Sequence, residues 1–170
     1  MRLFAGVFPS SEELRRILAV QDDLRLHLPA RLGWTRPERL HLTLRFFGDD
    51  AEENASAAAV SEAVEGIGAF DLVFDAVTGF PSARRARVVV LEARDPSDGI
   101  LRIGSRLNRE ESKPYRPHIT LARARTRQVA IEAPHFEPIL LRVSEVCLVH
   151  SVLGGPDAGY HVLRRWRLGE

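Results

Sequence analysis

The sequence predicts an α+β fold in which helices cover the outer faces of antiparallel sheet. Short apolar runs rich in β-branched residues alternate along the chain with three longer segments of helical periodicity. Turns rich in Gly and Pro separate neighbouring runs in the second half, which favours antiparallel pairing. A His-x-Thr-Leu motif also occurs twice, 77 residues apart. The repeat suggests an ancient duplication in which each half of the chain contributes one sheet and one motif to a shared cleft.

The first third of the chain predicts a strand, a helix and two further strands. Residues 2–8 form a short apolar run that is typical of a strand. Ser10 and Glu13 have the spacing of a capping box, so a helix begins there, and its apolar side chains keep close to a 3.6-residue period until Pro29. Strands are expected to follow at residues 34–36 and 40–47.

The rest of the chain predicts two more helices and five strands. An alanine-rich segment has Val60 and Val64 on one face, as in a helix, and Ser97 opens another. The helices are predicted at residues 51–67 and about 96–108, and the strands at residues 70–77, 85–92, 117–123, 140–150 and 160–168. The GFPSA turn predicts that the first two of these strands pair, and the GGPDAG loop predicts that the last two form a closing hairpin. No linker interrupts the pattern, so residues 1–170 are expected to form a single two-lobed domain.

The composition limits the class of protein. Of the 170 residues, 45% are hydrophobic, which is enough for a sizeable core. The net charge of +1 argues against general nucleic-acid binding, but the charge is uneven, because residues 81–130 contain 12 basic and 5 acidic residues. Within this stretch, Arg84, Arg85 and Arg87 form either an RNA-binding track or the solvated face of a turn and strand.

Signals for secretion and for membranes are missing from the sequence. Cys147 is the only cysteine, so no internal disulfide can form, and a reducing cytoplasm is the expected compartment. The apolar run near the amino terminus is too short for a signal peptide, and no stretch approaches the ~20 apolar residues of a membrane span. We therefore expect a cytoplasmic monomer with no membrane partner.

The two motifs are LHLTLRFFGD at residues 40–49 and RPHITLARAR at residues 116–125. Alternate residues of a strand point to the same side, so His41, Thr43 and Arg45 are predicted to share one face, and His118 and Thr120 repeat the arrangement. A single histidine in such a strand is more often a hydrogen-bonded structural residue. Chance predicts only about 0.02 copies of His-x-Thr-Leu in this composition, so the second copy favours a functional site.

Two histidines with two hydroxyl groups suit phosphoryl transfer. The unperturbed pKa of histidine, ~6.5, allows one ring to be neutral and another charged near neutral pH, as a paired base and acid require. In-line displacement at phosphorus puts the attacking and leaving oxygens on opposite sides, where one histidine can serve each. The threonine hydroxyls and an arginine would stabilise charge on the other phosphate oxygens.

Metal binding is the main competing interpretation, because two histidines could ligate zinc. Only Asp49 and Asp50, beyond a glycine, lie near either motif as a third ligand, and the chain has no HExxH or CxxC pattern. It also has no GxGxxG, Walker or GxSxG motif. We therefore expect no metal and no cofactor.

The sequence resembles the bacterial and archaeal RNA 2′,3′-cyclic phosphodiesterases, also called 2′-5′ RNA ligases, of the two-histidine phosphoesterase superfamily. The matching segments occur in order over nearly the whole chain: RLFAGVFP, RPERLHLTLRFFGD, GFPSARRARVVV, YRPHITLARAR and YHVLRRWRL. Arg36-Pro37, Arg116-Pro117 and Gly79 to Pro81 are typical of this branch. The resemblance implies a bilobal fold with pseudo-twofold symmetry, in which two antiparallel sheets line a central cleft.

The resemblance also implies roles for individual residues. His118 would be the general base that activates water, and His41 the acid that protonates the leaving 3′ oxygen, which leaves a terminal 2′-phosphate. Thr43 and Thr120 would hold phosphate oxygens, and Arg123 would add a phosphate contact. The expected partner is an RNA or oligonucleotide with a 2′,3′-cyclic phosphate end, and the expected reaction is its metal-independent hydrolysis.

Alternatives stay open. The useful reaction could be reversible 2′-5′ ligation or hydrolysis of a small cyclic nucleotide, or the chain could be a non-catalytic module that binds RNA ends. Many relatives have tryptophan where this chain has Val90, so a stacking platform for a base is either missing or supplied by another aromatic residue. The candidates are Phe4, Trp34, Phe47 and Tyr115, each of which also suits a core position. His150 is expected to be structural.

Overall fold

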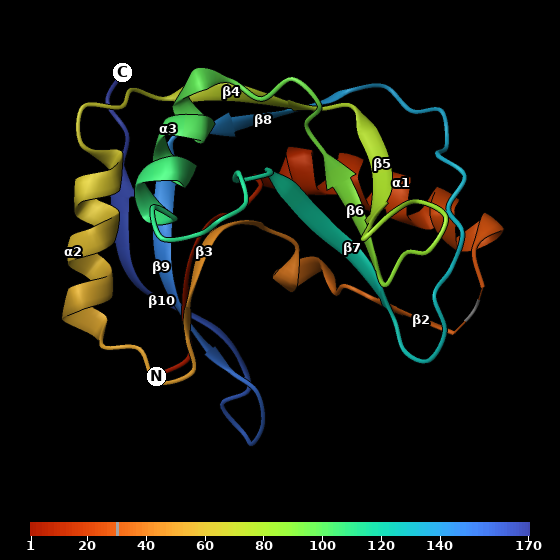
Figure 1. The fold of residues 1–170 in the computed structure, drawn as a ribbon, viewed down its shortest axis with the longest axis horizontal. Coiled ribbons are helices and arrows are strands. Elements are labelled where there is room, and N and C mark those ends of the chain that lie inside the picture. Colours follow the sequence, from red (N-terminus) through yellow and green to blue (C-terminus); the bar gives the residue numbers. More distant parts are fainter. Residues whose placement is uncertain (30) are drawn as a thin grey trace.

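The computed structural model describes residues 1–29 and 31–170, and Figure 1 shows how their elements are arranged. Within these residues the α-helices are α1 (Ser11–His27), α2 (Glu53–Val64) and α3 (Asp98–Leu107), and a short 3-10 helix, η1, spans Pro37–Arg39. The strands are β1 (Leu3–Val7), β2 (Leu32–Trp34), β3 (Leu42–Gly48), β4 (Phe70–Phe74), β5 (Ala76–Phe80), β6 (Val88–Glu92), β7 (His118–Ala124), β8 (Ile139–Val143), β9 (Glu145–Val152) and β10 (Gly159–Arg167).

The strands form one large antiparallel sheet and one small one. The large sheet runs β10-β9-β1-β3-β7-β6-β5, with β2 paired to β7, and the small sheet pairs β4 with β8. The large sheet has two parts, which we call the first lobe (β10-β9-β1-β3) and the second lobe (β2, β7, β6 and β5). Their strands pair only at Leu42 of β3 and Ile119 of β7. The predicted α+β class, with antiparallel sheets and helices outside them, is confirmed (Figure 1).

The two lobes do not correspond to the two halves of the chain, so the prediction that each half supplies its own sheet is wrong. The first lobe combines β1 and β3 from the beginning of the chain with the β9–β10 hairpin from its end. In the second lobe, β2 from the first half pairs with β7 from the second. These exchanges cover one edge of β1 and one edge of β7, which would otherwise present unpaired backbone groups.

Two of the predicted strands each prove to be two strands that belong to different sheets. The run at residues 70–77 divides into β4, which pairs with β8, and β5, which pairs with β6 as the GFPSA turn predicted. The chain turns at Asp75, whose carboxylate accepts hydrogen bonds from the backbone and side chain of Arg94. The run at residues 140–150 divides in the same way into β8 and β9. The predicted closing hairpin is confirmed as β9–β10.

Helix α1 begins at the predicted capping box and packs on the second lobe. The Ser10 hydroxyl accepts a hydrogen bond from the Glu13 N–H, and the Glu13 carboxylate accepts one from the Ser10 N–H. Farther along, the buried amide of Gln21 donates to the carbonyls of Thr35 and Leu121. Since Leu121 lies in β7, Gln21 fastens this helix to the strand that carries the second motif.

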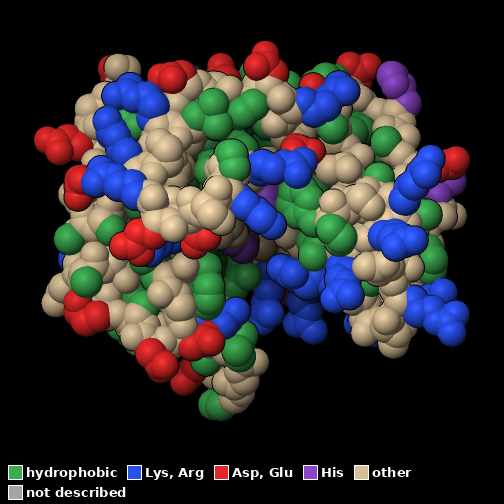
Figure 2. Space-filling view, viewed as in Figure 1, with side chains coloured by type: hydrophobic (Ala, Val, Ile, Leu, Met, Phe, Trp, Pro, Cys, Tyr) green, Lys and Arg blue, Asp and Glu red, His purple; other side chains and the backbone are tan. Residues whose placement is uncertain are grey.

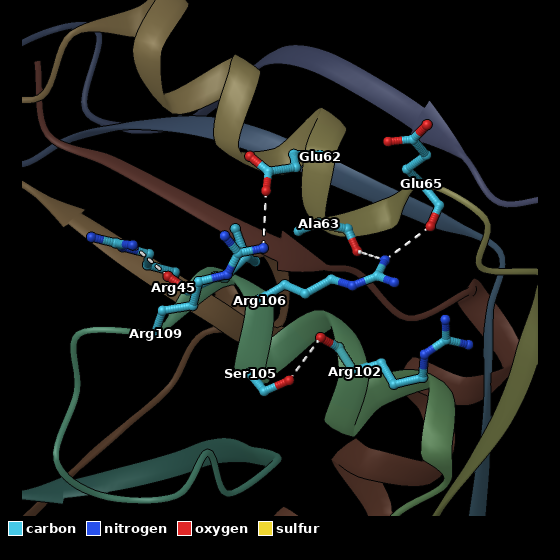
Figure 3. A network of polar contacts seen from close by, with 9 residues as sticks. Arg45, Glu62, Ala63, Glu65, Arg102, Ser105, Arg106 and Arg109 are labelled. Atoms are coloured by element: carbon cyan, nitrogen blue, oxygen red, sulfur yellow. Dashed lines mark hydrogen bonds and ion pairs between the residues drawn. The ribbon is translucent and has the colours of Figure 1, made fainter.

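Helices α2 and α3 pack against the first lobe and are joined by polar contacts (Figure 3). The Arg106 guanidinium donates to the carbonyls of Ala63 and Glu65, 3.0 and 2.9 Å away, which lack partners at the carboxyl end of α2. Arg109 forms an ion pair with Glu62 at 2.9 Å. These contacts fasten α3 to α2, and α3 also packs against β3, the strand that follows the first histidine.

Tyr115 connects α3 to the backbone of the first motif. Its ring packs directly on Gly104 in α3, where an added Cβ would lie 2.1 Å from the ring atom Cδ1. Its hydroxyl donates to the carbonyl of Thr43 at 2.8 Å. A glycine in the middle of a helix therefore makes the space for a residue that supports the motif strand.

We predict that Gly104→Ala lowers the free energy of unfolding by about 1–2 kcal/mol, measured by urea denaturation. The added methyl group overpacks the contact with Tyr115, and this cost exceeds the ~1 kcal/mol that alanine gains over glycine in a helix interior. Gly154→Ala is the control, because its Cβ would meet no atom within 4 Å, and it should change stability by less than ~0.5 kcal/mol. Unchanged or higher stability of Gly104→Ala would contradict the packing described.

Candidate active site

A β-bulge in β7 decides which of its side chains share a face. His118 and Thr120 lie on one face, and strict alternation would add Ala122 to it. The pairing with β6 skips Leu121, so β7 contains one extra residue at this point. Arg123 therefore takes the position on the face that alternation would have given to Ala122, beside both residues of the motif.

A bulge at the equivalent point in β3 also changes which of its side chains share a face. The pairing with β1 skips Leu44, immediately after Thr43. Arg45 borders the cleft, but its guanidinium reaches α3 and donates to the carbonyl of Leu107, so the guanidinium does not point with the motif residues as predicted. Phe46 comes onto the face of Thr43 instead, and this ring is 47% exposed. The two motifs thus differ at corresponding positions, where one has Phe46 and the other Arg123.

A cavity of about 1000 Å³ between the two lobes, which we call the central cleft, is lined by both motifs. Figure 2 shows a hollow near the middle of this face, with Lys and Arg side chains around it and histidine visible inside. All of the predicted site residues line the central cleft: His41, Thr43, His118, Thr120 and Arg123. The structure therefore brings together five side chains from different lobes: His41, directly before β3, Thr43 in β3, and the other three in β7.

Hydrogen bonds orient the His41 ring. Its Nδ1 lies 2.7 Å from the carbonyl oxygen of Arg39, to which it can only donate, so the neutral ring carries its proton on Nδ1. Its Nε2 lies 2.8 Å from the hydroxyl of Thr43, which then donates to it. The atom available for proton transfer is consequently Nε2, next to the motif threonine.

Aromatic rings enclose His41 on the first lobe. The Phe4 and Phe8 ring centroids lie 4.6 and 5.5 Å from the imidazole, and Tyr160 meets it edge-on at 5.4 Å. Gly6 leaves room for this packing, because a Cβ there would lie 3.2 Å from the imidazole Cδ2. The ring therefore has little freedom to turn away from the central cleft.

His118 repeats the hydrogen-bonding arrangement on the second lobe. Its Nδ1 lies 2.7 Å from the carbonyl oxygen of Arg116, again two residues earlier, so the neutral ring again carries its proton on Nδ1 and Nε2 is the atom available for proton transfer. Phe80 packs edge-on against the ring at 4.9 Å. Glu92 lies opposite His118 in β6 and pairs with the Arg116 side chain, with 3.0 Å from Nε to Oε1.

The environment lowers the pKa of both histidines. Burial is the main cause in each case, because it disfavours the charged ring. The hydrogen bonds to the Arg39 and Arg116 carbonyls oppose this effect, whereas the nearby positive charge of Arg123 adds to it. The charge of His118 also lowers the pKa of His41, so the two rings influence one another through the cleft. Both rings are accordingly neutral at neutral pH before an anion binds.

The basic stretch reaches the central cleft in part. Arg87, Lys113, Arg116 and Arg123 line it, but Arg84 and Arg85 do not. His150 does not line it either, and its ring lies 6.5 Å from that of His161. Of the three arginines at residues 84–87, for which an RNA track and a solvated face were both open, only Arg87 lines the cleft.

Several aromatic residues of the site could not be recognised from the sequence. Tyr160 and Phe80 contact the two histidines, yet they stood out only as parts of the YHVLRR and GFPSA segments. Among the proposed stacking platforms, Phe4 is 5% exposed beneath His41, and Phe47 and Tyr115 pack on the core. Phe46 is the exposed ring on the cleft, and only the bulge at Leu44 reveals its direction.

Neither a metal cluster nor a membrane span is found in the part of the chain that the structure describes. Over residues 1–29 and 31–170, no three His, Cys, Asp or Glu side chains lie close enough to hold a metal ion. No helix within the same residues is both long and apolar enough to cross a bilayer.

Comparison with known proteins agrees with this geometry. Residues 9–155 match the family model described as the 2′-5′ RNA ligase superfamily. The RNA 2′,3′-cyclic phosphodiesterase of Thermus thermophilus is 32% identical over 190 aligned positions, which cover 99% of this chain and 90% of that protein. The RNA 2′,3′-cyclic phosphodiesterase of Escherichia coli is 30% identical over 153 positions, covering 84% of each chain.

The fold is also similar to a solved structure. The crystal structure of E. coli LigT complexed with 3′-AMP superposes with a TM-score of 0.79 at 28% identity, covering 99% of this chain and 98% of that one. Because the family model spans most of the sequence and the similarity extends over the whole fold, the chain belongs to the 2′-5′ RNA ligase superfamily.

Proposed function

We propose that the protein hydrolyses an RNA-terminal 2′,3′-cyclic phosphate to a 2′-phosphomonoester without a metal ion. One observation carries the proposal: two histidines in one cleft both have Nδ1 tied to a backbone carbonyl, which leaves both Nε2 atoms for proton transfer. Relatives named RNA 2′,3′-cyclic phosphodiesterase, at 30–32% identity over most of the chain, support the assignment.

In the proposed reaction each histidine handles one oxygen of an in-line displacement. His118 accepts a proton from water as the water oxygen attacks phosphorus, and His41 donates a proton to the 3′ oxygen as the bond from phosphorus to that oxygen breaks. The products are a 2′-phosphomonoester and a free 3′-hydroxyl. Exchange of one proton with solvent at each ring restores the starting state. The more exposed position of His118 suits the residue that activates water.

Charge on the remaining phosphate oxygens requires donors at fixed positions, and the Thr43 hydroxyl, which donates to the neutral His41 ring, can donate to phosphate once Nε2 of that ring is protonated. The hydroxyls of Thr43 and Thr120 border the cleft from the two lobes, and Arg123 adds a positive charge on the face of the second motif. We assign these three side chains to the non-bridging oxygens, where preorganised donors stabilise the transition state most. All five groups come from one chain, so a monomer with a single two-lobed domain suffices.

Ligation is the second candidate, and the description of the matching family favours it. If a 5′-hydroxyl of a second RNA replaces water, the same base and acid join the two ends through a 2′-5′ bond. The two reactions share their residues and differ only in the nucleophile.

The direct test is to incubate the protein with an oligonucleotide that ends in a 2′,3′-cyclic phosphate, in the presence of EDTA, and to identify the new end group. We expect a 2′-phosphate at a rate that EDTA does not change. A 3′-phosphate would contradict the assigned leaving group, and loss of activity in EDTA that added metal restores would contradict the metal-free mechanism. Joined products on addition of a 5′-hydroxyl oligonucleotide would indicate ligation.

We predict that His41→Ala and His118→Ala each lower kcat by ~10²- to 10⁴-fold, because each removes a general acid or base. The double variant should lose little beyond either single variant, since the two rings act in one step. His150→Ala is the matched control, because that ring lies outside the central cleft, and it should retain activity within about threefold. Full activity of either cleft variant, with its fold intact by circular dichroism, would contradict the acid–base pair.

We predict a bell-shaped pH profile of kcat/KM with its optimum below about pH 6.5. The active free enzyme holds one protonated and one neutral ring, and this form is most abundant between the two pKa values of the pair, both of which burial lowers. Activity should therefore fall as the pH rises above the optimum and the acid loses its proton. A bound phosphate anion favours imidazolium, so the profile of kcat should lie at higher pH than that of kcat/KM. An optimum of kcat/KM above pH 7.5, or a single ionisation, would argue against this division of roles.

A further inference from the structure

A second cavity, of about 410 Å³, opens from the catalytic residues along β2 and the start of the first motif. We call it the arginine groove. It shares His41, Thr43, Thr120, Arg123 and Tyr160 with the central cleft, and its other lining residues are Gly33, Trp34, Thr35, Arg36, Arg39 and Arg125. The two cavities therefore meet where the phosphate would react.

The groove concentrates positive charge that the protein itself does not neutralise. Its lining includes Arg36, Arg39, Arg123 and Arg125 and no Asp or Glu. Within the described residues none of these four side chains forms an ion pair or a hydrogen bond, whereas nine other arginines pair with carboxylates. Like charges gathered without counter-charges oppose folding, so a cluster of this kind suits an anion supplied by a ligand.

The backbone sets the positions of these arginines. β2 pairs with β7, which brings Gly33 opposite Arg123. The Arg125 side chain crosses Gly33, where an added Cβ would lie 3.3 Å from its Nε. Arg36 is the N-cap residue of the short helix η1 and Arg39 is its last residue, and Arg39 lies over the Tyr160 ring at 5.5 Å. Planar guanidinium groups at fixed positions are well suited to bind phosphate through two hydrogen bonds.

We propose that the arginine groove binds the phosphodiester on the 5′ side of the terminal nucleoside, so that the substrate is an RNA strand rather than a free cyclic nucleotide. The proposal rests on the proposed function. The central cleft, with about 1000 Å³ and the exposed Phe46 ring, has room for the terminal nucleoside. An RNA strand carries one phosphate per nucleotide, so a second phosphate follows on the 5′ side of the terminal nucleoside. Positive side chains beside the reacting centre can bind this phosphate, and the arginine groove supplies them.

The test compares two substrates with the same terminal base: a 2′,3′-cyclic mononucleotide without a 5′-phosphate, and a dinucleotide with the same cyclic end. Only the dinucleotide has a phosphodiester for the groove. For the unmodified protein we expect kcat/KM to be at least about tenfold higher for the dinucleotide, the gain of one charge-assisted hydrogen bond.

The double variant Arg36→Gln with Arg125→Gln should lower this dinucleotide-to-mononucleotide ratio at least fivefold. These two residues are chosen because Arg123 is assigned to the reacting phosphate and Arg39 supplies the carbonyl that orients His41. Arg84→Gln with Arg85→Gln is the matched control, because it removes the same charge from exposed arginines that line neither cavity, and it should keep the ratio within twofold. The groove variant should also make the dependence of oligonucleotide binding on salt less steep, by ~0.7 in the logarithmic slope for each lost phosphate contact.

A ratio that changes less than twofold in the groove variant would overturn the proposal, and so would an equal loss of ratio in the control. If the double variant unfolds, the dinucleotide-to-mononucleotide ratio of kcat/KM is measured for each single variant instead. Failure of the proposed function is distinguishable, because the unmodified protein would then hydrolyse neither substrate. In that case fluorescence anisotropy with a labelled dinucleotide that ends in a 3′-phosphate still tests the groove, and equal affinity of the unmodified protein and the groove variant would refute it.

Discussion

The structure of the site depends on one repeated interaction, the hydrogen bond from a histidine Nδ1 to the carbonyl two residues earlier. It joins His41 to Arg39 and His118 to Arg116, at 2.7 Å in both cases. Each bond fixes the tautomer of its ring and directs Nε2 to the cleft. Because the acceptor is backbone and not a carboxylate, the bond itself brings no negative charge to either ring, and Glu92, which raises the pKa of His118, is outweighed by burial. Burial then lowers the pKa of both rings. A bound phosphate anion has the opposite effect, because its negative charge favours the protonated ring.

The second constraint is the pair of bulges that follow the motifs. An extra residue directly after each motif threonine, Leu44 in β3 and Leu121 in β7, shifts the alternation of side chains at that point. The shift brings Phe46 to the cleft from the first lobe and Arg123 from the second. The strands of the two lobes pair only at Leu42 and Ile119, so the cleft between them stays open to a substrate while the motifs remain close. One lobe thus offers an aromatic surface and the other a positive charge.

Much of this architecture could be predicted from local sequence. The capping box at Ser10, the closing β9–β10 hairpin and the cleft position of both motifs follow from residue spacing. Spacing could not reveal that β9–β10 would pair with β1, or that residues 70–77 would turn at Asp75 into a second sheet, because an apolar run does not specify its partner strand. The bulges could not be predicted for the same reason. The position of Phe46 on the cleft therefore became evident only from the strand register, and the arginine groove only from the folded surface. Arg36 and Arg39 precede the first motif, but nothing in their spacing connects them with Arg125.

The central claim is that both imidazoles act through Nε2 on one phosphorus. Nitrogen-15 NMR of the two rings measures this most directly, as a pH titration with and without 3′-AMP. The account predicts that in the free protein both rings carry the Nδ1 proton when neutral and titrate below about pH 6.5, and that the nucleotide phosphate raises the pKa of both. A ring with its proton on Nε2, or a nucleotide that perturbs one histidine and leaves the other unchanged, would contradict it.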